Sequence, residues 1–319
     1  MSLYYQPSGQ LPPAGVWRFL AGGLLAAGLL AFGYVFLLWR WPPLGIFLPL
    51  VFGVGLGAVL KALARRGKLR HPRRVGHLAL LLGLAALYLQ WSVYLTLRSS
   101  PGTVVHGQLV RANGRFEAGA WISQLTSPGG MIEQISQINA LAIDDGPLAS
   151  WWYLLLFWGG EALAVVGLAR LLAREQAAAP FSEATNAWAL AEVLPRPVRP
   201  VPAVAVLRAA LEAGDFQALV PMFTKATVAQ LLSRPPSNFV FLKHYYAPGD
   251  ANCHYLTVTS FTRKPGRYRP SFSAEPVVEY LCLTAAAAVE LQTRFGSLPS
   301  AAPYGSGSPG NTVGPSKES

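Results

Sequence analysis

Apolar side chains gather into four long stretches of this chain, separated by short polar segments. They run from Trp17 to Trp41, from Pro43 to Leu63, from Val75 to Leu97 and from Ser150 to Ala173. Each has at least the roughly 20 residues that a helix needs to cross about 30 Å of hydrocarbon. The pattern predicts four transmembrane helices and therefore a multi-pass membrane protein.

The first stretch has a secretory signal peptide as its alternative. Its apolar run is much longer than a signal core of roughly 7 to 15 residues, and it ends in Trp39, Arg40, Trp41 and Pro42 without a small-residue cleavage site. We therefore expect a first membrane helix, with residues 1–16 as a cytoplasmic segment. The composition, 52% hydrophobic and 13% charged, agrees with a membrane protein.

The short loop 61–74 between the second and third stretches is strongly basic and contains no acidic residue. Its cations are Lys61, Arg65, Arg66, Lys68, Arg70, Arg73 and Arg74. Short loops rich in Lys and Arg stay in the cytoplasm, so we expect both termini inside and residues 98–149 outside. This loop also accounts for much of the formal charge of +11. We expect its cations to contact anionic lipid headgroups, and we expect no nucleic-acid partner.

Small residues recur at four-residue spacing in the first two stretches. They are Gly22, Gly23, Ala26, Ala27 and Gly28 in the first and Gly53, Gly55 and Gly57 in the second. Such faces let helix backbones approach closely in lipid. Since the turn from Trp39 to Pro43 is short, we expect the two helices to form a hairpin packed through Gly22, Gly23, Gly53 and Gly57. A homodimer seam is the alternative use of these faces.

Glu161 is an acidic side chain deep inside the fourth stretch, about 16 Å from its start by helical rise. An ionised carboxylate is costly at that depth, so we expect it to be neutral or paired and turned toward the bundle interior. Candidate partners at compatible depth are Gln90, Tyr88 and Tyr34, all uncharged hydrogen-bond donors. Glu161 either fixes helix packing or relays a proton or cation.

Residues 98–149 form the predicted outer segment. The Asn113-Gly114 pair, within Leu109 to Phe116, suits a tight hairpin turn. After Pro128, apolar residues recur at helical spacing, at Met131, Ile135, Ile138 and Ala142. This predicts an amphipathic helix that packs on the bilayer or on the bundle.

Past Arg174 the sequence is typical of a soluble region. Residues 174–202 are predicted to hold a juxtamembrane helix, Phe181 to Leu194, and a stiff proline-rich linker. Residues 203–296 predict helices at Ala203–Ala213, Thr224–Ser233 and Ala285–Phe295, and strands at Asn238–Tyr246, Cys253–Thr262 and Pro276–Thr284. The predicted fold is a membrane bundle of four helices followed by a small cytoplasmic α+β domain with a three-stranded antiparallel sheet. Residues 297–319, rich in Gly, Ser and Pro, are expected to be disordered.

Cys253 and Cys282 are the two cysteines, and both fall on predicted strands. Neither has Cys or His in zinc-ligand spacing, so we expect no metal and no cofactor. A basic turn of Arg263, Lys264, Arg267 and Arg269 is expected to contact anionic lipid or an acidic partner, with a plain solvated loop as the alternative. No phosphate loop, nucleophile elbow or carboxylate pair is present in the sequence of this domain, which argues against an enzyme.

Three short motifs carry a resemblance to a known group. Tyr4-Tyr5-Gln6-Pro7-Ser8-Gly9, the segment Ser127 to Asn139, and the segment Pro180 to Trp188 are similar to an uncharacterised family of bacterial four-span membrane proteins. The resemblance implies a bacterial inner-membrane location and no established activity. It also places a Cys-x-x-Cys of the relatives at Ser182 and Thr185, so this chain lacks the zinc knuckle that the motif implies for them.

Two functional hypotheses follow. In the first, a non-enzymatic bundle anchors a cytoplasmic domain that binds another protein. In the second, the chain is a small transporter or channel component that uses Glu161 as a proton or cation site, either alone or as a homo-oligomer.

Overall fold

The structure, a computed structural model, describes residues 3–99, 102–105, 108–112, 116–144, 151–194, 198, 203–220, 238–264 and 271–296. These residues fall into two compact units. One unit is Gln6–Phe181, and the other joins Met1–Tyr5 to Ser182–Ser319.

The first unit contains four long helices, α1 (Pro13–Arg40), α2 (Leu48–Arg66), α3 (Pro72–Ser99) and α6 (Trp151–Ala178). Each is long and apolar enough to cross a membrane, which confirms the four predicted spans. The second helix begins later than predicted because Pro42–Ile46 form a short 3-10 helix, η1, after α1. The fourth continues to Ala178 and ends just before Pro180, which cannot donate a helical hydrogen bond.

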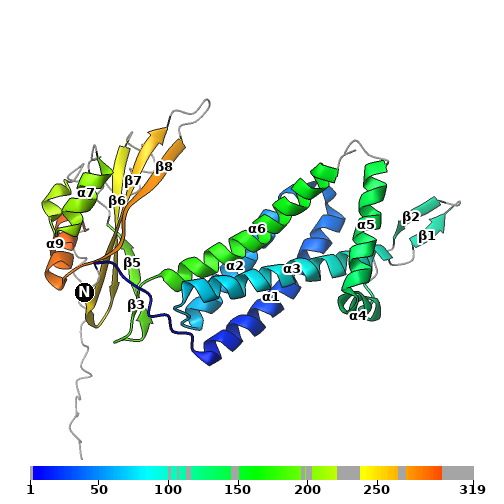
Figure 1. The fold of residues 1–319 in the computed structure, drawn as a ribbon, viewed down its shortest axis with the longest axis horizontal. Coiled ribbons are helices and arrows are strands. Elements are labelled where there is room, and N and C mark those ends of the chain that lie inside the picture. The colour runs from blue at the N-terminus through cyan, green and yellow to red at the C-terminus, as the bar shows by residue number, and fades with distance from the viewer. Residues whose placement is uncertain are drawn as a thin grey trace, which may run out of the picture. The chain divides into compact units, whose positions relative to one another are not determined.

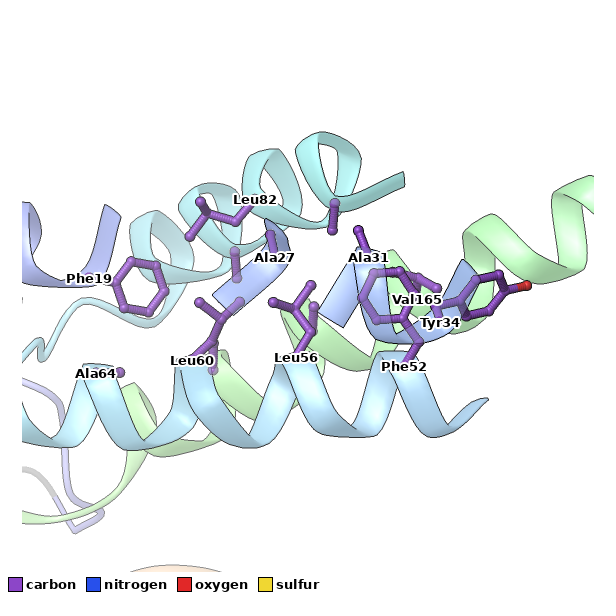
Figure 2. Close-up of a cluster of buried hydrophobic side chains, with 14 of the residues drawn as sticks. Phe19, Ala27, Ala31, Tyr34, Phe52, Leu56, Leu60, Ala64, Leu82 and Val165 are labelled. Carbon is purple, nitrogen blue, oxygen red and sulfur yellow. The ribbon is translucent and has the colours of Figure 1, made fainter. Parts of the chain in front are cut away.

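The bundle has α1 packed on α2 and α3, and α6 packed on the same two helices (Figure 1). A row of buried side chains on α2, Phe52, Leu56, Leu60 and Ala64, recurs every four residues and therefore stays on one helix face. Figure 2 shows this row with Tyr34 of α1 near one end of the cluster. The packed core thus runs along the helices and reaches the hydroxyl of Tyr34.

The glycines of α2 contact a different helix from the one predicted. A Cβ added at Gly53 would lie 2.5 Å from the Ala164 carbonyl oxygen, and one at Gly57 would lie 2.9 Å from the Leu168 carbonyl oxygen. Both carbonyls belong to α6, so the prediction that Gly53 and Gly57 face the first helix is wrong. Spacing identifies a close-packing face, but it does not identify the partner helix.

The glycines of α1 do face their predicted neighbour. A Cβ added at Gly22 would lie 3.1 Å from side-chain atoms of Leu63, and one at Gly23 would lie 2.9 Å from Leu60. Gly23 also faces Leu82 of α3, with a nearest distance of 2.5 Å. The first helix therefore packs through its small residues on leucines of α2 and α3.

Between α3 and α6 the chain forms a hairpin and two helices. Strand β1 (Gly102–Val105) pairs antiparallel with β2 (Gln108–Ala112), so the hairpin lies upstream of the Asn113-Gly114 pair that was predicted to form its turn. Residues 113–115 lie outside the described residues. Helix α5 (Pro128–Asp144) confirms the amphipathic helix predicted after Pro128, and α4 (Ala118–Thr126) was not predicted.

The second unit is built on an antiparallel sheet of β5 (Leu190–Val193), β6 (Asn238–Ala247), β7 (Asp250–Lys264) and β8 (Ser271–Cys282), in that order. The sheet has four strands, not the predicted three. Helices α7 (Val204–Glu212) and α9 (Ala285–Phe295) cover one face (Figure 1). Their leucines pack with alternate residues of β6 and β7 into a second core, through Leu207, Leu211, Leu291, Val240, Leu242, Leu256 and Val258.

The fourth strand replaces the predicted juxtamembrane helix. Instead of a helix from Phe181 to Leu194, the chain forms a short pair, β3 (Phe181–Ser182) with β4 (Ala187–Trp188), followed by β5. The β5 sequence Leu-Ala-Glu-Val has good local helix formers, but its backbone groups pair with β6 from Leu190↔Tyr246 to Val193↔Lys243. Pairing with a strand about fifty residues away overrides that local preference.

The remaining predicted elements of this domain are close to those observed. Strands β6 and β7 and helix α9 cover their predicted ranges, α7 is one residue shorter than predicted at each end, and β8 begins five residues before the predicted Pro276. Asp215 accepts a hydrogen bond from the Gln217 amide and begins the 3-10 helix η2 (Phe216–Ala218). The predicted helix at residues 224–233 and the tail from residue 297 lie outside the described residues.

The first residues of the chain belong to this second unit. The Tyr5 amide donates to the Tyr280 carbonyl at 2.9 Å, and the Cys282 amide donates to the Leu3 carbonyl at 2.9 Å. Leu3 to Tyr5 therefore run along the β8 edge of the sheet. The segment predicted as a plain cytoplasmic extension contributes to the fold of the C-terminal domain.

Candidate functional site

Glu161 lies on α6 with its side chain inside the bundle, and the residue is only 6% exposed. Its Oε1 accepts a hydrogen bond from the Tyr34 hydroxyl at 2.7 Å and another from Gln90 Nε2 at 2.5 Å. The structure thus brings two of the three candidate partners to the carboxylate. The third, Tyr88, donates instead to the Leu125 carbonyl at 2.8 Å, at the end of α4.

All four long helices meet at this point. Tyr34 comes from α1 and Gln90 from α3, and the Tyr34 ring packs on Phe52 of α2 with the centroids 5.5 Å apart. Tyr34 reaches across the bundle because α1 and α6 are each packed on α2 and α3 rather than on one another. The carboxylate therefore links helices that have few direct backbone contacts.

The charge of Glu161 has no basic partner. Among the described residues no Lys, Arg or His lies within ion-pair distance of its carboxylate, and the two donors on Oε1 are neutral. Hydrogen bonds stabilise a buried carboxylate, but they leave its net charge in place. The arrangement can therefore take up a proton or hold a cation.

Two cavities flank the carboxylate. The first has a volume of about 210 Å³ and is lined by Tyr34, Val35, Leu38, Gly45, Gln90, Trp91, Tyr94, Ile138, Phe157, Trp158 and Glu161. The second, of about 390 Å³, is lined by Leu84, Leu87, Tyr88, Trp91, Pro128, Met131, Ile132, Ile135, Trp158, Glu161 and Ala162. Both share Trp91, Trp158 and Glu161, so the carboxylate lies where the two cavities meet.

Aromatic rings form the wall between the cavities. Trp91 and Trp158 stack with their ring centroids 4.0 Å apart, and Tyr94 and Phe157 pack edge-on against this pair. Two polar atoms here are buried without a hydrogen-bond partner, Gln90 Oε1 and Trp158 Nε1. Buried polar atoms are nearly always paired, so an unused acceptor and an unused donor mark a place where a ligand or water can bind.

The cavities lie toward the end of the bundle opposite the basic loop. The first reaches Gly45, in η1 after α1, and helix α5 lines both, through Ile138 in the first and through Met131 and Ile135 in the second. On the other side of Glu161, Leu60, Val165 and Ala169 have no exposed surface. The cavities therefore lie in the half of the bundle away from the basic loop, and side chains such as Leu60 and Ala169 are packed in the other half.

The predicted basic cluster separates into three groups. Arg65, Arg66, Arg73 and Arg74 are exposed, and Lys68 is half-buried. Lys61 pairs with Glu175 of α6 at 3.1 Å. The contact of the exposed arginines with lipid headgroups stays a prediction.

Arg70 is not a lipid contact. It is 4% exposed, its Nη2 donates to Gln10 Oε1 at 2.6 Å, and its guanidinium lies 4.3 Å from the centre of the Phe181 ring. Its backbone also pairs with Gly9 and Gln10. The prediction for Arg70 is wrong because the segment before α1 covers it.

In the second unit, the predicted basic turn is described only in part. Arg263 and Lys264 are exposed at the end of β7, and Arg267 and Arg269 lie outside the described residues. Cys253 and Cys282 are free thiols on β7 and β8. Burial raises the pKa of Cys253 to about 11, so this thiol stays protonated and is a poor nucleophile near neutral pH.

The turn that carries Ser182 and Thr185 is closed by hydrogen bonds. The Ser182 hydroxyl donates to Asp250 Oδ2 at 2.5 Å and accepts from the Thr185 amide at 3.1 Å. No group of three or more His, Cys, Asp or Glu side chains able to hold a metal is found within the described ranges. These polar contacts join the β3–β4 turn to the start of β7.

The sheet face opposite α7 and α9 is aromatic, a feature that the sequence analysis missed. Phe239 stacks on Phe261 with centroids 5.1 Å apart, and Phe241 and Phe272 pack against the same rings. Tyr245, Tyr255 and Tyr280 continue this face toward the other end of the strands. Alternation along β6 of Phe239, Phe241, Lys243 and Tyr245 was the signal that could have revealed it.

Comparison of the chain with protein-family models, with curated proteins and with solved structures finds no match.

Proposed function

We propose that the bundle is a small membrane transporter in which Glu161 binds the transported proton or cation. One observation carries this proposal: a buried carboxylate without a basic partner lies where two cavities meet. Carboxylates that face the interior of a membrane bundle commonly mark ion pathways and proton relays. Tyr34 and Gln90 hold the carboxyl group in place through neutral donors, and neither supplies a positive charge that would compete with a cation.

The packing favours a transporter over an open channel. The cavities reach one end of the bundle, whereas the opposite half is filled by side chains such as Leu60 and Ala169. A transporter exposes its site to one side at a time and opens the other by moving helices against each other. In this proposal, the ion enters the described arrangement from the end of the bundle away from the basic loop.

The first test is proton or cation flux into liposomes that contain the purified full-length chain. We expect the wild type to dissipate an imposed pH gradient or membrane potential. The flux rate of Glu161→Gln should be at least about tenfold lower than that of the wild type. Glu133→Gln, at an exposed carboxylate on α5, is the matched control and should retain the wild-type rate. Equal flux in Glu161→Gln and wild type contradicts the proposal.

A second candidate is that the bundle anchors the C-terminal domain for binding to another protein. The aromatic sheet face around Phe239 and Phe261 favours it, because aromatic side chains are enriched at protein interfaces and Phe261 is partly exposed. Flux separates the two candidates. An anchor needs no flux, and Glu161→Gln would leave its partner binding unchanged.

We place the protein in a bacterial inner membrane with both termini in the cytoplasm. The exposed arginines of the loop after α2 support this orientation. The pairing of Leu3 and Tyr5 with β8 requires the start of the chain and the C-terminal domain to lie on the same side of the membrane, and the basic loop then favours the cytoplasm as that side. Four crossings satisfy that requirement.

A further inference from the structure

We propose that the Glu161 cavities bind a lipophilic organic monocation that carries an ammonium N–H group. This proposal rests on the proposed function and names the class of its substrate. The argument has three steps, which concern the charge of the site, its walls and its unused acceptor.

The carboxyl group of the site favours a cation. Glu161 is 6% exposed and has two neutral donors on one oxygen. A buried charge without a partner is strongly destabilising. Binding of a group of opposite charge therefore stabilises the site. A single carboxylate matches a single positive charge.

The walls favour an organic cation over a metal ion. Five aromatic side chains line the first cavity, Tyr34, Trp91, Tyr94, Phe157 and Trp158. The faces of Trp and Tyr attract organic ammonium groups, and apolar walls cannot supply the several oxygen ligands that Na⁺ or Mg²⁺ needs. The second cavity, lined by leucines and by Met131, Ile132 and Ile135, offers space for an apolar substituent.

The unused acceptor selects a cation with an N–H group. Gln90 Oε1 is buried without a partner, while Gln90 Nε2 already donates to Glu161. An ammonium N–H can donate both to this oxygen and to the carboxylate. A quaternary ammonium has no proton to donate and leaves Gln90 Oε1 unpaired, so it should bind more weakly.

The experiment measures binding of 4-phenylbutylamine, which is protonated at pH 7, to the full-length chain in phosphatidylcholine nanodiscs. Isothermal titration with empty nanodiscs subtracted separates binding from partition into lipid. We expect saturable binding that is at least about tenfold tighter than that of the uncharged isostere 4-phenylbutanol. The N-trimethyl derivative should bind several-fold more weakly than the primary amine.

Variants locate the site. We expect Glu161→Gln to weaken amine binding at least about tenfold, and Trp158→Phe to weaken it a few-fold, because a phenyl ring attracts a cation less than an indole ring. Glu133→Gln should bind as the wild type does. The comparison of the amine with the alcohol uses the wild type alone, so it tests the ligand class even if a variant fails to fold.

Equal affinity for the amine and the alcohol overturns the ligand class, and unchanged amine binding in Glu161→Gln overturns the site. Neither result alone contradicts the transporter proposal, which the flux measurement tests. Glu161-dependent flux without amine binding leaves the transporter and removes this substrate class. Amine binding without flux leaves the ligand site and removes transport.

Discussion

At the scale of single residues, the most informative contacts are those of buried polar groups. Glu161 could be selected from the sequence because depth in a predicted helix follows from counting residues, and Tyr34 and Gln90 followed from the same count. Tyr88 has a compatible depth, but it turns toward α4, a helix that the sequence did not predict. Depth is thus readable from sequence, whereas the direction of a side chain around the helix axis depends on every neighbouring helix.

A second buried polar pair lies in the C-terminal domain. His244 on β6 is 1% exposed, and its Nε2 lies 3.2 Å from His254 Nδ1 on β7. The two rings stack with centroids 5.3 Å apart. Burial, together with the smaller effect of the neighbouring His254, lowers the pKa of His244 to about 4.

This pair predicts acid sensitivity of the domain. In the unfolded chain His244 binds a proton near its ordinary pKa of 6.5, while the folded state resists protonation until about pH 4. The free energy of unfolding therefore has its full value above about pH 6.5, where His244 is neutral in both states. Protonation of His244 in the unfolded chain lowers this free energy as the pH falls toward 4, by up to about 3 kcal/mol. Hydrogen exchange of β6 and α9 amides at pH 7 and pH 5, corrected for intrinsic rates, measures the loss.

His244→Gln is the matched variant, because it keeps a polar side chain and removes the titration. Its amides should show a smaller loss of protection between pH 7 and pH 5 than the wild type. An equal loss in both proteins would mean that other groups cause the acid sensitivity.

At the scale of helices and strands, the close approach of α2 to α6 depends on glycine. A Cβ at Gly53 would lie 2.5 Å from the Ala164 carbonyl oxygen, a backbone atom that cannot move without shifting its helix. We expect Gly53→Val to destabilise the bundle by about 1–3 kcal/mol through overpacking. Thermal unfolding of the full-length protein in detergent should show a lower midpoint.

Gly28→Val controls for the helix propensity of valine. A Cβ at Gly28 meets no heavy atom within 4 Å, so this variant should unfold close to the wild-type temperature. A similar midpoint for both variants would show that the α2–α6 contact tolerates separation.

The elements themselves were largely predictable, and their partners were not. The length of the apolar stretches located the four long helices, because a segment that crosses lipid must satisfy its own backbone hydrogen bonds and so forms a helix. It failed for β5, whose Leu-Ala-Glu-Val sequence has no β-branched run and becomes a strand only by pairing with β6. It failed equally for Gly53 and Gly57, since a face of small residues fits any helix that approaches it.

At the scale of the whole molecule, the first described residues constrain how many times the chain crosses the membrane. Leu3 to Tyr5 lie along β8, and Tyr4 donates its hydroxyl hydrogen to Glu212 of α7. Residues near a chain terminus are often poorly ordered, but Leu3 to Tyr5 are held in place because the β8 edge of the sheet supplies partners for their backbone groups. The pairing ties the start of the chain to a domain that follows the fourth span, so an even number of crossings is required.

The proposed orientation can be tested residue by residue with a membrane-impermeant maleimide on intact cells. In a background of Cys253→Ser and Cys282→Ser, Ser136→Cys on α5 should react from outside, since this position is exposed and lies between the third and fourth spans. Arg73→Cys, at the exposed start of α3, should react only after permeabilisation, because the proposed orientation puts the basic loop in the cytoplasm. Labelling of Arg73→Cys in intact cells would show that the topology is the inverse of the proposed one. The Glu161 cavities would then open toward the cytoplasm, and the transport proposal would require uptake of its cation from that side.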